Sequence, residues 1–254
     1  MSTDVSYLEL SDSRRIAYRR REGHGPELLF LPGFASNMEG TKALWLWQAA
    51  ADRDLACTLF DYSGHGRSSG AFEDGAIGDW AADALAVLDT VTRGPQIVVG
   101  SSMGGWIGLL LARTRRERLA GLIGIAAAPD FTEDLIRPRL TDDLRATLER
   151  DGRLLHPSRY DENPSVFTKH LLDEARNQLV MRAPIAFGGP VHLIHGQRDP
   201  DVPWQTALAI AARVTSDDVT VELVKDGEHR LSRPQDLARL GGALDRVLAG
   251  ASAT

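Results

Sequence analysis

The chain has 254 residues, of which 43% are hydrophobic and 25% charged, with 24 glycines, 12 prolines and one cysteine. This composition excludes intrinsically disordered, collagen-like and disulfide-framework proteins, and the length suits one α/β domain with an insertion. The net charge of −6 argues against a nucleic-acid partner, because modules that bind the phosphate backbone carry a clustered basic face.

The single cysteine, Cys57, allows no internal disulfide, which points to a reducing compartment. No apolar run reaches 18 residues, and residues 1–10 lack the apolar segment of a signal peptide. The sequence therefore predicts a soluble, cytoplasmic protein without an integral membrane segment.

The first residues predict a hairpin of two extended runs, 7–10 and 15–18, around the polar turn 11–13. Short apolar runs then alternate with helical segments. The predicted strands are 28–31, 57–60, 96–99, 122–125, 191–194 and 219–223, and the predicted helices are 38–51, 79–91, 102–113, 205–214 and 234–248. This alternation predicts a mostly parallel sheet covered by helices on both faces, with ligands bound at the carboxyl ends of the strands.

Residues 130–189 interrupt this rhythm and are too long for a connecting loop. They contain no convincing strand, and their apolar spacing predicts helices at 141–150 and 165–181. We interpret them as a helical cap inserted into an α/β core formed by residues 1–129 and 190–254. The alternative is that the second helix simply packs on the core.

A candidate nucleophile lies in Gly100-Ser101-Ser102-Met103-Gly104, which matches the pattern G-x-S-x-G. The pattern stands directly between a predicted buried strand and a predicted helix, which is the context of a nucleophile elbow. Small neighbours are needed there because the backbone of the nucleophile is strained. The rival Ser101 is not framed by glycines at the same offsets, so Ser102 is the predicted nucleophile.

A serine nucleophile needs a general base, and in folds with this elbow the chain order is serine, acid, histidine. The acid is expected after the predicted strand 191–194, where Asp199 and Asp201 compete; Asp199 lies closer to the strand end. Only His229 follows that segment, so it is the predicted base. His65 precedes the serine and suits a loop-shaping or substrate-rim role, and His195 suits a strand-end residue bonded to backbone.

The tetrahedral intermediate of acyl transfer needs two hydrogen-bond donors. The backbone N–H groups of Met103 and Phe34 are the candidates, since one follows the nucleophile and the other follows the predicted strand 28–31. Phe167 and Leu171 of the cap are candidate walls for an acyl chain. No residue cluster has zinc-site spacing and no glycine-rich phosphate loop is present, so the sequence implies no cofactor and no metal.

Several stretches together resemble the α/β-hydrolase superfamily. They are Leu31-Pro32-Gly33-Phe34, Glu39-Gly40-Thr41-Lys42-Ala43-Leu44, Phe60-Asp61-Tyr62-Ser63-Gly64, Gly100-Ser101-Ser102-Met103-Gly104-Gly105-Trp106, His195-Gly196-Gln197-Arg198-Asp199 with Val202-Pro203-Trp204, and His229-Arg230. The branch they are most similar to is that of the mitochondrial palmitoyl-protein thioesterase, also called mycophenolic acid acyl-glucuronide esterase. The similarity runs from about residue 27 onward.

The resemblance implies a Ser102–His229–Asp199 triad that hydrolyses acyl esters or acyl thioesters, with a small-molecule, lipid-acyl or acylated-protein substrate. No mitochondrial targeting segment precedes the domain, so a compact bacterial relative is expected. One alternative keeps the triad but acts as a generic short-chain carboxylesterase or C–C bond hydrolase. An alternative of another class is a non-catalytic ligand-binding protein of the same fold.

Overall fold

The computed structural model describes residues 4–157 and 164–251. An eight-stranded sheet with the order β1-β2-β4-β3-β5-β6-β9-β10 forms its centre. Its strands are β1 (Ser6–Glu9), β2 (Arg15–Arg21), β3 (His24–Leu31), β4 (Leu55–Phe60), β5 (Gln96–Ser101), β6 (Leu119–Ile125), β9 (Val191–Gly196) and β10 (Val219–Val224). Only the pairings of β1 with β2 and of β2 with β4 are antiparallel, which confirms the mostly parallel sheet and its opening hairpin.

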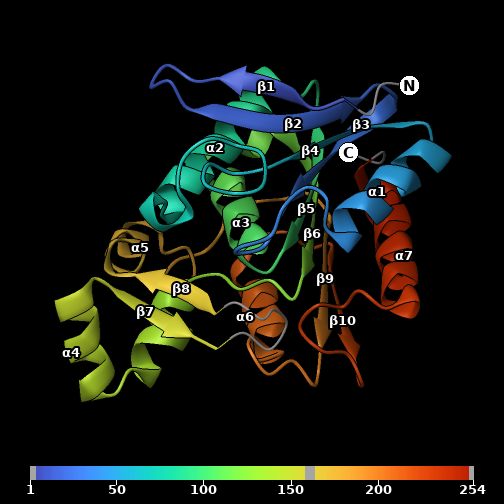
Figure 1. Ribbon diagram of the computed structural model, residues 1–254. Coiled ribbons are helices and arrows are strands. Elements are labelled where there is room, and N and C mark those ends of the chain that lie inside the picture. The colour runs from blue at the N-terminus through green and yellow to red at the C-terminus, as the bar shows by residue number, and fades with distance from the viewer. Residues whose placement is uncertain (1–3, 158–163, 252–254) are drawn as a thin grey trace.

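Helices cover both faces of this sheet (Figure 1). They are α1 (Thr41–Asp52), α2 (Ile77–Thr90), α3 (Met103–Arg115), α6 (Gln205–Arg213) and α7 (Pro234–Ala251). The buried side chains of α1 and α7 belong to one core cluster, and those of α2, α3 and α6 belong to the other. The sheet separates the two clusters, because strands buried on both faces supply apolar residues to each side.

The insertion between β6 and β9 differs from the sequence prediction. It contains α4 (Asp142–Asp151) and α5 (Lys169–Glu174), but also a two-stranded antiparallel sheet of β7 (Arg153–His156) and β8 (Ser165–Thr168). Short helical turns complete the chain: η1 (Phe72–Asp74), η2 (Arg116–Arg118), η3 (Thr132–Ile136), η4 (Arg137–Arg139) and η5 (Ala175–Gln178). The first helix of the predicted cap is confirmed. A purely helical cap is wrong, and the helix predicted over 165–181 is helical only over 169–178, in α5 and η5.

Local chemistry explains why the second helix starts late. The Thr168 side chain accepts a hydrogen bond from the Leu171 backbone N–H at 3.0 Å, which makes Thr168 the N-cap of α5. The residues before it are β-branched or aromatic at Val166 and Phe167, and such side chains favour a strand when a partner is available. β7 supplies that partner. The prediction from apolar spacing failed here because such spacing does not show at which residue a helix is N-capped.

Near its C-terminal end, at residues 178–181, the insertion is held against the core by buried polar contacts. The Asp130 carboxylate accepts hydrogen bonds from the Val180 and Met181 N–H groups at 2.9 and 3.0 Å. The Trp106 indole donates to the Gln178 carbonyl at 3.0 Å. The division into a core and a cap stays a prediction, and residues 1–3, 158–163 and 252–254 within it lie outside the described residues.

In the described part of the chain, no helix combines the length and apolar character needed to span a membrane.

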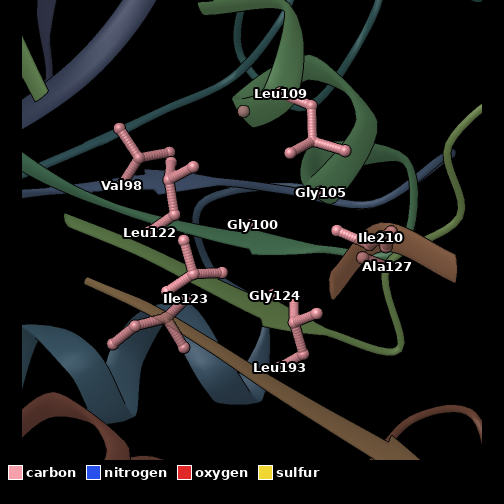
Figure 2. A pocket seen from close by; sticks show the side chains of 12 residues that line it. Val98, Gly100, Gly105, Leu109, Leu122, Ile123, Gly124, Ala127, Leu193 and Ile210 are labelled. Atoms are coloured by element: carbon pink, nitrogen blue, oxygen red, sulfur yellow. The ribbon is translucent and has the colours of Figure 1, made fainter. Parts of the chain in front are cut away.

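A small apolar cavity of about 20 Å³ lies between α3 and the strands β5, β6 and β9 (Figure 2). Glycines leave this space open, because Gly100, Gly105, Gly108 and Gly124 line it together with residues such as Val98 and Leu193. Its volume is close to that of one water site, but its lining offers a water almost no polar partner. The cavity is therefore an apolar packing gap between α3 and the sheet.

Two glycines of α3 differ in the space around them, which predicts opposite effects on stability. A Cβ at Gly108 would lie 3.3 Å from Val98 Cγ1. The Val98 side chain borders the cavity and can shift into it. We therefore expect Gly108→Ala to stabilise the fold by about 0.5–1 kcal/mol. A Cβ at Gly105 would lie 2.4 Å from Ala127 Cβ, so Gly105→Ala should destabilise it by about 1–3 kcal/mol. Urea unfolding midpoints measure both changes, and shifts of the same sign would contradict this account.

Candidate active site

Ser102 lies in a sharp turn between β5 and α3. Its backbone has φ 52° and ψ −115°, which is a strained conformation for a residue with a side chain. The turn is tight on both sides: a Cβ at Gly100 would lie 2.4 Å from the Gly104 carbonyl oxygen, and a Cβ at Gly104 would lie 2.0 Å from that of Leu31. The rival Ser101 is the buried last residue of β5.

The structure brings the three predicted triad residues together from distant parts of the chain. His229 Nε2 lies 3.0 Å from Ser102 Oγ, and His229 Nδ1 lies 2.7 Å from Asp199 Oδ2. Both distances are those of hydrogen bonds. Asp199 and His229 lie in the loops that follow β9 and β10, and these neighbouring parallel strands end at the same edge of the sheet.

The Asp199 side chain is fully buried and well supplied with donors. Its Oδ1 accepts hydrogen bonds from the backbone N–H groups of Asp201 and Val202, both at 2.9 Å. Burial alone would raise the pKa of Asp199, but hydrogen bonds from His195 and His229 hold it well below its usual range. The carboxylate is therefore ionised at neutral pH. Asp201 contributes its backbone to this loop, and the Asp199 side chain contacts His229.

The loop after β3 passes directly beside the nucleophile. A Cβ at Gly33 would lie 3.5 Å from Ser102 Cβ. The backbone of this loop therefore runs close to Ser102 just before Phe34. The buried Asp61 supports this loop by accepting the Met38 N–H at 2.7 Å. Met103 begins α3, and the first N–H groups of a helix have no intrahelical partner. The Phe34 and Met103 N–H groups thus remain the candidate oxyanion donors.

Aromatic side chains surround the Phe34 ring. Its centroid lies 4.9 Å from Phe72, 5.9 Å from Trp80 and 6.1 Å from Phe131, and Phe167 of the insertion stacks on it at 5.2 Å. Phe167 is half-buried. The other predicted wall residue, Leu171, is only 2% exposed and belongs to the core, so it is no longer a candidate for contact with substrate.

Two further residues near His229 make contacts that the sequence did not predict. Lys42 of α1 donates to the Arg230 carbonyl at 2.6 Å and to Ser232 Oγ at 3.2 Å, which ties α1 to the loop of His229. Burial lowers the pKa of Lys42 to about 8. His195 donates to the Val202 carbonyl, as expected for a strand-end residue, but its ring also reaches Asp199.

His65 is buried rather than placed on a rim. Its Nδ1 lies 3.1 Å from the Ser63 carbonyl oxygen, and its ring packs on Phe72 and Trp80 at 4.9 and 5.1 Å. These contacts fit the predicted loop-shaping role.

Asp199, Asp201 and His229 are the group of potential metal ligands found among the described residues, with ligand atoms within 4.8 Å of one another. The His229 nitrogens and Asp199 Oδ2 already contact each other and Ser102. The hydrogen-bond chain accounts for this cluster, and we assign no ion to it.

Comparisons with known proteins give a consistent result. The model of a family described as "Alpha/beta hydrolase family" matches residues 28–240. The human mitochondrial palmitoyl-protein thioesterase ABHD10 is 36% identical over 247 residues, covering 97% of this chain and 80% of that protein. A crystal structure of an Agrobacterium vitis S4 protein is 43% identical with a TM-score of 0.92, covering 96% of this chain and 98% of that one. Mouse alpha/beta hydrolase domain-containing protein 10 is 37% identical with a TM-score of 0.91, covering 97% and 99%.

These comparisons correct one prediction. The sequence predicted a cytoplasmic protein, but the mammalian relatives that match nearly the whole chain are mitochondrial by name. The cytoplasmic prediction was wrong because it relied on the lone cysteine and the first residues. A reduced cysteine is compatible with more than one compartment.

Proposed function

Because the chain belongs to the alpha/beta hydrolase family, we propose that it is a serine hydrolase that cleaves acyl esters or acyl thioesters. The observation that carries this proposal is the unbroken hydrogen-bond chain from Asp199 through His229 to Ser102. Such a chain activates an alcohol that is otherwise a poor nucleophile.

The proposed reaction proceeds through an acyl-enzyme. Ser102 Oγ attacks the acyl carbon while His229 Nε2 takes its proton, and the Phe34 and Met103 N–H groups stabilise the oxyanion. His229 then protonates the leaving alkoxide or thiolate, which departs and leaves the acyl group on Ser102. In the second half, His229 Nε2 takes a proton from a water that attacks the acyl-enzyme ester, and it returns that proton to Ser102 Oγ as the carboxylic acid leaves.

The surroundings of Phe34 favour an apolar acyl group. Phe34 directly follows Gly33, which packs close to Ser102, and the Phe34 ring stacks on Phe167, so the surface near this loop is aromatic rather than charged. The thioesterase relatives act on palmitoyl-protein by name. We therefore infer a preference for a medium or long acyl chain, carried by a thioester or an activated ester, on a small molecule or on a protein.

A panel of acetyl, octanoyl and palmitoyl groups, each presented as a thioester and as an ester, tests this preference. We expect kcat/KM to rise by at least about tenfold from acetyl to octanoyl, because several methylenes enter an apolar site. In the variant Phe167→Ala this rise should shrink, while the rate on the acetyl substrate should change little. An optimum at acetyl would favour the short-chain carboxylesterase, and turnover of a β-diketone in its place would favour a C–C bond hydrolase.

A further inference from the structure

The Asp199 carboxylate contacts a second imidazole besides that of His229. His195 Nε2 lies 3.2 Å from Asp199 Oδ2, the same oxygen that lies 2.7 Å from His229 Nδ1. His195 stands near the end of β9, four residues before Asp199, and its side chain is 1% exposed. Two histidines therefore share one oxygen of the proposed catalytic acid.

The surroundings of His195 determine where its proton lies. Its Nε2 is also 3.1 Å from the Val202 carbonyl oxygen, and both of its neighbours are acceptors. Nε2 must therefore carry the hydrogen, which it donates to the Val202 carbonyl while it lies in close contact with Asp199 Oδ2. The other nitrogen, Nδ1, is buried with no hydrogen-bond partner in the described part of the chain.

That buried nitrogen is costly, because an unpaired polar atom loses its hydrogen bonds to water on burial. A leucine would fill the position without this cost. The cost is understandable if the ring is needed for its Nε2–H group.

We propose that His195 is a positioning residue that holds Asp199 Oδ2 in line with His229 during the reaction. Oδ1 is held by the Asp201 and Val202 N–H groups, and Oδ2 is held by His195 on one side while His229 occupies the other. In the described part of the chain, the other side chain in contact with Oδ2 is the imidazole that Asp199 has to orient. The His195 N–H group also partly offsets the negative charge of Asp199. The carboxylate therefore stabilises the His229 imidazolium less than it would without His195.

This inference rests on the proposed function, and kinetics of three His195 variants test it. His195→Leu removes the donor, His195→Gln keeps an N–H group near the Nε2 position, and the shorter His195→Asn does not reach Oδ2. The matched control is His192→Leu, which removes another buried histidine of β9 that contacts Glu222 rather than the triad.

For His195→Leu we expect kcat to fall about 10- to 100-fold with KM within about twofold, as for other small displacements of a catalytic group. The acidic limb of the kcat/KM profile should move to higher pH by about 0.5 unit, because the undivided charge of Asp199 favours the protonated base. His195→Gln should recover most of both changes. A merely structural role would leave the acidic limb in place.

The proposal is overturned if His195→Leu matches His192→Leu in kcat and in pH profile, or if His195→Leu does not fold and the Gln and Asn variants are equally active. Failure of the proposed function would look different. If the proposed function fails, Ser102→Ala keeps its activity. If only the role of His195 fails, Ser102→Ala is inactive and the His195 variants keep the kcat and the pH profile of the parent protein.

Discussion

Replacing Ser102 by alanine should lower kcat on a p-nitrophenyl ester or an acyl thioester by about 10⁶-fold, by analogy with the nucleophile of serine proteases. The variant loses the only atom that can form the acyl-enzyme from this elbow, while the oxyanion donors and the substrate site remain. The fold should be retained, because alanine fits the same turn with less steric demand than serine. Single-turnover and steady-state assays measure the loss.

Ser101→Ala is the matched control, since it removes the neighbouring hydroxyl from the buried end of β5. We expect its kcat to stay within about threefold of the parent protein, as for a substitution away from the reacting atoms. A fluorophosphonate should label Ser102 and no other residue. A loss of less than tenfold in Ser102→Ala would reassign the nucleophile, and the absence of any adduct together with no turnover would favour the ligand-binding alternative.

Replacing Asp199 by asparagine should lower kcat by about 10⁴-fold, the magnitude seen when the acid of a serine protease triad becomes an amide. An amide nitrogen facing His229 Nδ1 would favour the tautomer that carries its hydrogen on Nε2. That nitrogen could then no longer accept the Ser102 proton. Because the substitution preserves shape, the variant should fold, and the loss should appear in kcat rather than in KM.

Asp201→Asn is the control for this prediction, because the sequence alone left Asp201 as a competing acid. The structure uses the backbone N–H of Asp201 to support Asp199, and an asparagine keeps that group. We expect less than about a fivefold change in kcat, because the substitution keeps this N–H group and leaves the contact between Asp199 and His229 in place. A larger loss in Asp201→Asn than in Asp199→Asn would exchange the two roles.

The regular elements were predictable because their signals are local. Buried strands such as β5 and β9 are short apolar runs, and α3 follows a Gly-Ser turn whose chemistry is contained in five residues. The order of serine, acid and histidine further limited the base to His229. Residues 165–168 were mispredicted as helix because they form a strand only by pairing with β7, a partner that apolar periodicity does not reveal.

The sequence by itself determined the alternating α/β architecture and the position of the turn at Ser102, and it predicted His229 as the base, since each depends on spacing along the chain. Only the tertiary structure showed that Asp199 contacts His229, that Leu171 is buried, that Phe167 stacks on Phe34 and that His195 lies against Asp199. These are contacts between side chains whose directions depend on how separate loops meet at the edge of the sheet. Hydrogen bonds act over about 3 Å, so the choice between neighbouring candidates requires positions that spacing along a chain does not specify.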